Sequence, residues 1–159
     1  MNNANNQIAV ESLNRIMELE LAGVVKYTHY SLMIFGYNRI PIVEWLKGNA
    51  TESLNHAHRA GELVTLLGGH PSLKIGPLLE TEKHNIGDIL RESLEHETLA
   101  LASYYDLLKI ATRTHPETSG VQSVLLEEYA RDLIVQEEMH LDEVNKMLRR
   151  PGDICTFAE

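Results

Sequence analysis

The sequence predicts an all-α protein, a bundle of four long helices, and three observations support this fold class. Glycine and proline collect in three stretches, residues 36–41, 68–87 and 115–120, while long segments such as 88–114 and 121–150 contain neither. Within the long segments, apolar residues recur every three or four positions, as amphipathic helices require. No segment alternates apolar and polar residues in the way that would indicate a strand.

The helices are expected at residues 6–36, 42–67, 84–113 and 119–149, followed by a short tail at 151–159. Gly68 and Gly69 mark the end of the second helix, and Pro116 and Pro151 mark the ends of the third and fourth. Short first and third connections predict two antiparallel hairpins. The middle connection has about sixteen residues, enough to run the length of the bundle at about 3.3 Å per residue. We therefore expect a single domain over residues 1–159, with one long crossover between its two hairpins.

Composition narrows the classes of function. The 159 residues are 43% hydrophobic and 23% charged, an ordinary globular mixture. No apolar run approaches the roughly 20 residues of a membrane helix, and the N-terminus lacks a signal-peptide pattern. The net charge of −9 argues against nucleic acid as a partner. The single cysteine, Cys155, allows no disulfide framework and no cysteine-based metal site, which favours the cytoplasm.

Each expected helix places one glutamate within its apolar stripe. Because a helix turns about 100° per residue, Glu20 falls in line with Leu13, Met17 and Tyr27 of the first helix. The other helices repeat this arrangement, and two of them add a histidine about one turn further on. The complete set is Glu20, Glu52, His56, Glu97, Glu137 and His140.

Buried carboxylates that face one another are costly unless cations neutralise them. Four glutamates carry four negative charges, which two divalent cations would balance. Oxygen ligands with two imidazoles suit iron or manganese, and a glutamate on each of two helices with Glu-x-x-His on the others is the di-iron carboxylate arrangement. Residues 137–140 contain this motif directly. His58 is expected to face away from His56, and the other five histidines lack such partners, so we expect them on the surface or in loops: His29, His70, His84, His96 and His115.

The sequence resembles the bacterioferritin branch of the ferritin-like family over residues 8–148. The resemblance is carried by LELAGVVKYTHYSLM, ESLNHAHRAGELVTLLGGHPSL, LRESLEHETLALASYYDLL and EEYARDLIVQEEMHLDEV. It implies that Glu20 and Glu97 are ligands from the first and third helices, and that Tyr27 lies beside the di-iron centre as an auxiliary residue. It also implies that His56, Glu137 and His140 are ligands from the second and fourth helices.

The sequence departs from that family in three places. Ser53, and not a glutamate, stands three residues before His56, so we predict that Glu52 supplies the bridging carboxylate of the second helix. The family's haem-binding methionine is replaced by Leu54, so haem bound in that way is not expected. Only nine residues follow Arg150, which leaves little room for the short fifth helix that accompanies the family's 24-subunit shell.

The resemblance and the ligand set together predict a ferroxidase that oxidises Fe(II) with O2 or H2O2, for iron storage or detoxification. The expected cofactors are two iron ions, with manganese as the other option. The expected assembly is a homo-oligomer built from dimers, with a shell of 12 or 24 chains as the larger form. Three alternatives stay open: a di-iron peroxidase or hydroxylase of the same fold, a Dps-type mini-ferritin, and a non-enzymatic assembly bundle.

Overall fold

The structure, a computed structural model, describes residues 3–113 and 121–153, and all regular secondary structure within them is helical. The helices are α1 (Asn3–Met33), α2 (Arg39–Leu66), α3 (Ile86–Arg113) and α4 (Val121–Leu148). The predicted all-α four-helix bundle is therefore confirmed. His115, Pro116, the expected start of the fourth helix at residue 119, and Cys155 in the expected tail lie outside the described residues.

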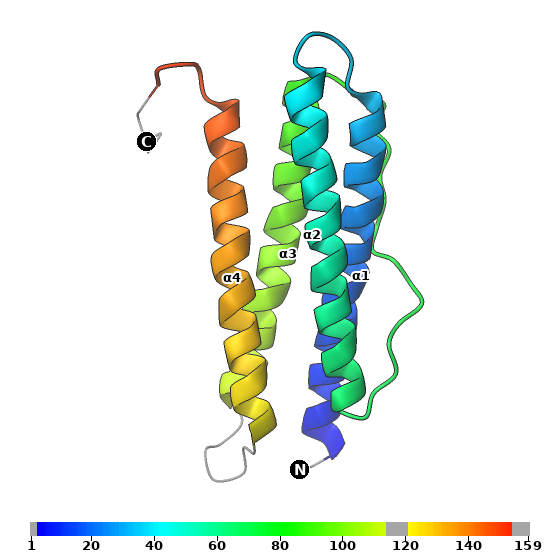
Figure 1. Cartoon of the computed structure of the whole chain (residues 1–159). Helices are drawn as coiled ribbons and strands as arrows, with labels where there is room; N and C mark the ends of the chain where they lie inside the picture. Colours follow the sequence, from blue (N-terminus) through cyan, green and yellow to red (C-terminus); the bar gives the residue numbers. More distant parts are fainter. Residues whose placement is uncertain (1–2, 114–120, 154–159) are drawn as a thin grey trace.

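The helices form two antiparallel hairpins, α1 with α2 and α3 with α4, and the crossover at residues 67–85 runs back along the bundle between them (Figure 1). Helix α1 packs against both α2 and α3, and α3 packs against α4. By contrast, the backbones of α2 and α4 stay apart, and only side chains span the space between them. No helix among the described residues has the length and apolar character needed to cross a bilayer.

Glycines end both helices of the first hairpin. Helix α1 stops at Met33, three residues before the expected boundary, and Gly36 follows in the left-handed region at φ 95°. Gly68 adopts φ 77°, and the N–H of Gly69 donates to the carbonyl of Val64 at 2.9 Å. This is the common way of satisfying the last carbonyls of a helix.

Hydrogen bonds hold the crossover against α1. The N–H of Gly76 donates to the carbonyl of Glu18 at 2.7 Å. The side chain of Asn14 donates to the carbonyl of His70 at 3.0 Å and accepts from the N–H of Ser72 at 2.9 Å. The path of the crossover is thus set by α1, which it follows for most of its length (Figure 1).

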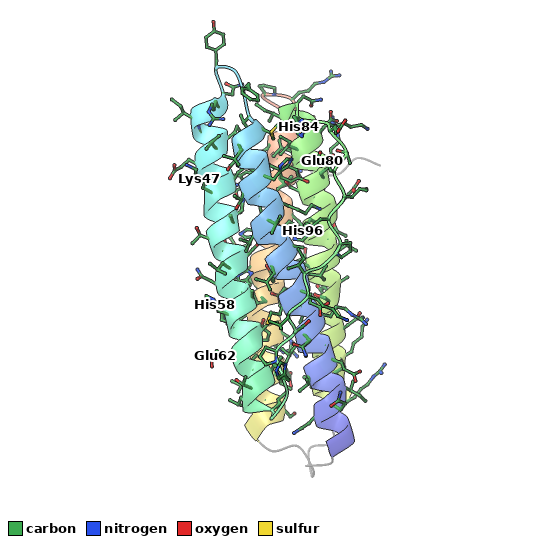
Figure 2. All side chains as sticks on the ribbon, turned by 90° about the vertical axis from the view of Figure 1, so that its right-hand side faces the viewer. Lys47, His58, Glu62, Glu80, His84 and His96 are labelled. Atoms are coloured by element: carbon green, nitrogen blue, oxygen red, sulfur yellow. The ribbon has the colours of Figure 1, made fainter. Side chains whose placement is uncertain are left out.

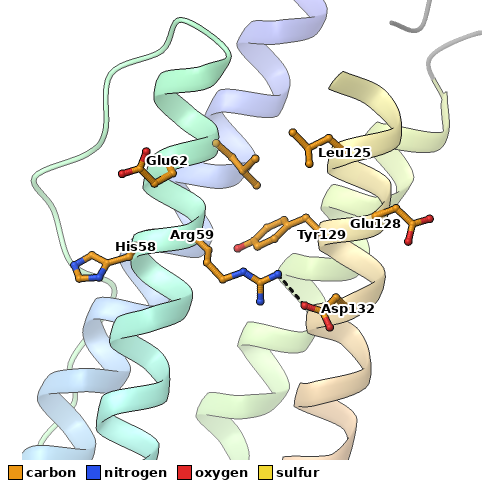
Figure 3. Close-up of a pocket in the computed structure, with 8 residues that line it drawn as sticks. His58, Arg59, Glu62, Leu125, Glu128, Tyr129 and Asp132 are labelled. Atoms are coloured by element: carbon orange, nitrogen blue, oxygen red, sulfur yellow. Dashed lines mark hydrogen bonds and ion pairs between the residues drawn. The ribbon is translucent and has the colours of Figure 1, made fainter. Parts of the chain in front are cut away.

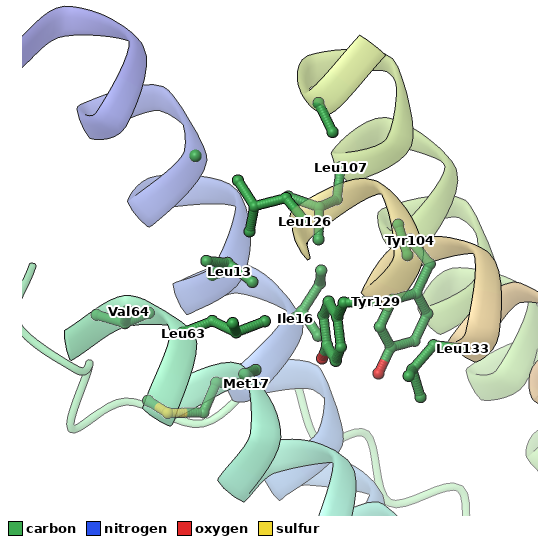
Figure 4. Close-up of a cluster of buried hydrophobic side chains, with 14 of the residues drawn as sticks. Leu13, Ile16, Met17, Leu63, Val64, Tyr104, Leu107, Leu126, Tyr129 and Leu133 are labelled. Atoms are coloured by element: carbon green, nitrogen blue, oxygen red, sulfur yellow. The ribbon is translucent and has the colours of Figure 1, made fainter. Parts of the chain in front are cut away.

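Two apolar clusters form the core. The larger cluster involves all four helices and is shown in Figure 4; its fully buried members include Leu13, Ile16, Leu107 and Leu133. Burying each such side chain contributes about 1.5–3 kcal/mol to stability. A smaller cluster contains Tyr27, Leu46 and Ile89. On α1, α2 and α3, the polar residues of the expected metal site lie between these two clusters along the chain.

Candidate metal centre

Four of the six expected ligands are buried in the middle of the bundle, one from each helix. The residue exposures are 3% for Glu20, 4% for His56, 6% for Glu97 and 1% for Glu137. Each of these side chains lies on the inner stripe of its helix because its spacing from the buried apolar residues is three, four or seven. Charged residues are almost never buried to this extent without a partner.

Glu20, His56 and Glu137 form a first group of converging donor atoms. His56 Nδ1 lies 3.4 Å from Glu20 Oε1 and 3.2 Å from Glu137 Oε1. One donor atom from each residue lies within 4.8 Å of the other two. Two carboxylate oxygens and one imidazole nitrogen are donors that suit iron or manganese.

Glu97, Glu137 and His140 form a second group, so Glu137 belongs to both. His140 Nδ1 lies 3.8 Å from Glu137 Oε2, and this oxygen is buried without a hydrogen-bond partner in the part of the chain that the structure describes. An unsatisfied buried carboxylate oxygen is rare and costly. A cation between the two groups would satisfy this oxygen, so the residues fit a dinuclear centre with Glu137 as the shared ligand.

The Nε2 atoms of His56 and His140, on the side of each ring away from the buried carboxylates, also have polar partners. His56 Nε2 lies 3.3 Å from Gln136 Oε1, and His140 Nε2 lies 3.1 Å from Glu52 Oε2. Such contacts fix the tautomer and ring orientation of metal-binding histidines. They turn the Nδ1 atoms of both rings toward the buried carboxylates.

Glu52 therefore takes a different place from the other glutamates. Its side chain is 38% exposed, and it belongs to neither group of converging donors. In this structure it contacts the outer side of His140, which is a position for orienting a ligand. Its role as the bridging carboxylate stays a prediction.

Ser53 and His96 occupy the space between α1, α2 and α3. Ser53 is 7% exposed, and a Cβ on Gly23 would lie 2.8 Å from both Ser53 Oγ and His96 Nε2. The close approach of these helices thus depends on the missing side chain of Gly23. A long side chain at position 53 would compete for the same space.

The expectation of a surface or loop position for His96 is wrong, because its exposure is only 4%. Burial, together with the nearby charge of Lys26, lowers the pKa of His96 to about 4, so the ring is neutral at physiological pH. The sequence signal was the small-residue stripe of α3, since Ser93, Ala100 and Ser103 are buried on the same side.

Two tyrosine hydroxyl groups make hydrogen bonds to buried carboxylates of the site. The hydroxyl of Tyr27 donates to Glu97 Oε1, and that of Tyr104 donates to Glu20 Oε1 at 2.7 Å. Burial and the neighbouring carboxylates raise the pKa of both tyrosines well above the ordinary value, so both keep their protons. Sequence reasoning singled out Tyr27 but missed Tyr104, although its place on the stripe seven residues after Glu97 pointed to it.

The electrostatics of the site reflect crowding of negative charge. Burial raises the pKa of Glu20, and burial together with the adjacent carboxylate of Glu137 raises that of Glu97 well above its ordinary value. Burial alone would lower the pKa of His56, but its hydrogen bonds with Glu137 and Glu20 raise it to about 10. Burial would raise the pKa of Glu137, but its contact with His56 and the nearby His140 lower it overall. Protons thus compensate for part of the charge, and binding cations would displace them.

Two pockets lie in the space between α2 and α4, next to the site. A pocket of about 480 Å³ lies beside His140, and its lining includes the carboxylates of Glu52, Asp142 and Glu143. A second pocket, of about 580 Å³, lies between the same two helices (Figure 3). There Arg59 spans the gap to Asp132 at 2.8 Å.

A long four-helix bundle with one crossover, whose core gathers carboxylates and imidazoles, is the architecture of ferritin-like proteins. A model of the ferritin-like domain matches residues 10–151, and the chain belongs to the ferritin-like family. A search of curated protein sequences finds no significant match.

Three solved structures illustrate the likeness in fold. A ferritin-like diiron-carboxylate protein from Bacillus anthracis is 19% identical, with a TM-score of 0.82 over 94% of this chain and 100% of that chain. The bacterioferritin of Rhodobacter capsulatus is 21% identical, with a TM-score of 0.78 over 89% and 84% of the two chains. The bacterioferritin of Desulfovibrio desulfuricans is 21% identical, with a TM-score of 0.77 over 91% and 80%.

Proposed function

We propose that this protein is a ferroxidase, which binds two Fe(II) ions in the centre of its bundle and oxidises them to Fe(III). The observation that carries the proposal is the convergence of three buried carboxylates and two imidazole Nδ1 atoms, with an unsatisfied Glu137 oxygen between them. The described donors come from all four helices of one chain, which favours this function over a mini-ferritin with metals at subunit interfaces.

The proposed ligands divide into two sets. Glu20, His56 and Glu137 hold one iron, and Glu97, His140 and the second oxygen of Glu137 hold the other. Each Fe(II) gives up one electron, and O2 with two protons is reduced to H2O2, or H2O2 with two protons to water. Manganese suits the same donors.

The chain's own residues orient the ligands and attract the substrate. Tyr27 and Tyr104 fix the carboxylates of Glu97 and Glu20, while Glu52 and Gln136 fix the two imidazoles. The pocket beside His140 is lined by three carboxylates and one ammonium group, that of Lys146, and this excess of negative charge favours the approach of a divalent cation.

Fe(II) oxidation, followed by absorbance of the ferric product, tests the proposal. Wild-type protein should oxidise Fe(II) faster than buffer, and Glu20→Ala or Glu97→Ala should remove the difference. Glu95→Ala is the matched control, because Glu95 is an exposed neighbour on α3 and its loss changes the net charge equally. Wild-type rates in both ligand variants would overturn the assignment.

The pocket beside His140 favours a second candidate, a peroxidase or hydroxylase that uses the same ligands on a small substrate. Iron loading separates the two functions. Storage predicts uptake far beyond two irons per chain, whereas the second candidate predicts that uptake stops at two.

Homo-oligomeric assembly is a further part of the proposed function. Large apolar side chains are exposed near the α1–α2 turn, including Leu32, Phe35 and Ile40. Self-association would cover such surfaces. A native mass above the 18.0 kDa of one chain is the expected result.

A further inference from the structure

A second group of metal-binding side chains lies outside the bundle core, where the crossover meets α1. It consists of His29 on α1 together with Glu80 and His84 in the crossover. Figure 2 shows Glu80 and His84 next to each other near one end of the bundle, away from His96 in its interior. None of the three residues belongs to the proposed ferroxidase centre.

The three side chains converge on one point. Glu80 Oε2 lies 2.7 Å from His29 Nε2, and Glu80 Oε1 lies 3.4 Å from His84 Nε2. The two imidazole rings are 5.7 Å apart, and one donor atom from each residue lies within 4.8 Å of the others. The side chains are only partly exposed, at 40% for His29, 49% for Glu80 and 25% for His84.

The two imidazole nitrogens provide an independent observation. Both Nε2 atoms are shielded from solvent, and both face the same carboxylate, that of Glu80. Two imidazole nitrogens that converge on one carboxylate, each turned away from solvent, form the donor pattern of a metal site. A bound cation would use both lone pairs.

The surroundings hold this arrangement in place. Glu80 Oε1 accepts a hydrogen bond from the N–H of Glu82 at 2.6 Å, and this bond lowers the pKa of Glu80, which keeps the carboxylate ionised. Thr81 and Tyr30 both donate to the carboxylate of Glu92 on α3, Tyr30 at 2.9 Å. The ring of Tyr30 also lies 6.0 Å from that of His29. The donors are therefore positioned by α1, the crossover and α3 together.

We propose that His29, Glu80 and His84 form a mononuclear site for a divalent transition-metal ion of the Zn²⁺ class. Two imidazole nitrogens and one carboxylate oxygen are typical ligands for such ions, and the partial exposure leaves room for water as a further ligand. Bound metal would join the crossover to α1 by coordination bonds. This would add to the hydrogen bonds that Gly76 and Ser72 make further along the same segment.

Metal binding is measured with Co²⁺ as the probe, in the reference variant Glu20→Ala/Glu137→Ala, which lacks two ligands of the ferroxidase centre. This separates the two sites, so the result does not depend on ferroxidase activity. The reference variant should bind about one Co²⁺ per chain with visible d–d absorption. Adding His84→Ala should weaken binding by about tenfold or more, because even the loss of a residue that only orients a ligand costs 10–100-fold. Circular dichroism checks that each variant is folded.

His70→Ala is the matched control, because His70 lies in the same crossover, is exposed, and belongs to none of the groups of converging donors found among the described residues. Equal Co²⁺ binding with and without His84→Ala would overturn the proposal, as would an equal loss in His70→Ala. Hydrogen exchange of the full wild-type chain gives a second measurement. Zn²⁺ should slow exchange over residues 78–85, and an unchanged rate there would also contradict the site.

Discussion

The larger apolar cluster and the carboxylate layer, defined as Glu20, His56, Glu97 and Glu137, are neighbouring parts of one core with opposite energetics. In the apolar cluster, fully buried Leu13, Ile16 and Leu133 add stability with each methylene that they remove from water. In the carboxylate layer, burial opposes ionisation, and protons and hydrogen bonds compensate for it only in part. The apolar cluster therefore stabilises the fold, whereas the buried ionisable groups of the carboxylate layer destabilise it in the absence of cations.

The sharpest test of this division is a cavity in the apolar cluster. Leu133→Ala should lower the free energy of unfolding by about 2–5 kcal/mol, because a fully buried leucine loses its contacts and leaves a void. Urea denaturation measures the change. The rate of Fe(II) oxidation per folded chain should stay the same, and a large fall in that rate would show that the two parts of the core are coupled.

Bound cations should offset the destabilisation by the carboxylate layer. With Mn²⁺ at about 100 times its dissociation constant, the free energy of unfolding should rise by about 2.7 kcal/mol for each site filled. Thermal unfolding with and without EDTA measures this stabilisation. Glu137→Ala should lose most of it because this residue belongs to both donor groups, and an undiminished shift in that variant would contradict the shared-ligand assignment.

Glu52 lies at the edge of the carboxylate layer, and two variants distinguish its possible roles. If it orients His140, Glu52→Ala should weaken one metal by about 10–100-fold, while Glu52→Gln, which can still accept a hydrogen bond, should weaken it less. If it bridges the two ions, both variants should bind one metal instead of two. Metal titration decides between these outcomes, and Ser53→Ala, on the same helix, should leave both affinities unchanged.

The smallest effect is expected at Glu97, where the surroundings favour a neutral side chain. Burial and the adjacent carboxylate of Glu137 raise the pKa of Glu97 well above its ordinary value, which favours the protonated form of its carboxyl in the metal-free protein. Glu97→Gln, which is uncharged and has nearly the same shape, should then lower the free energy of unfolding in EDTA by only about 1 kcal/mol or less, yet it should reduce metal binding. Urea denaturation checks the first part. A loss of several kcal/mol would mean that the carboxylate is ionised in the metal-free protein.

Much of the core could be predicted from sequence periodicity. Glu20, Glu97 and Glu137 stand three or four residues from buried apolar neighbours, and a rigid helix converts this spacing into a direction in space. The same reasoning misplaced His96, because serines and alanines on α3 carry too weak an apolar signal to show that their side of the helix is also buried. It could not settle Glu52, which lies near the margin of the buried face of α2.

The sequence by itself determined the four helices, their hairpin order and the residues that face inward, because helical periodicity and helix breakers act locally. Only the tertiary structure decided which oxygen of Glu137 stays unpaired, which side of His140 meets Glu52, and how closely Gly23 lets α1 approach its neighbours. It alone brought His29 to Glu80 and His84, more than fifty residues away. Such contacts depend on the path of the crossover and on helix packing, and these are fixed by interactions between distant segments that no local pattern records.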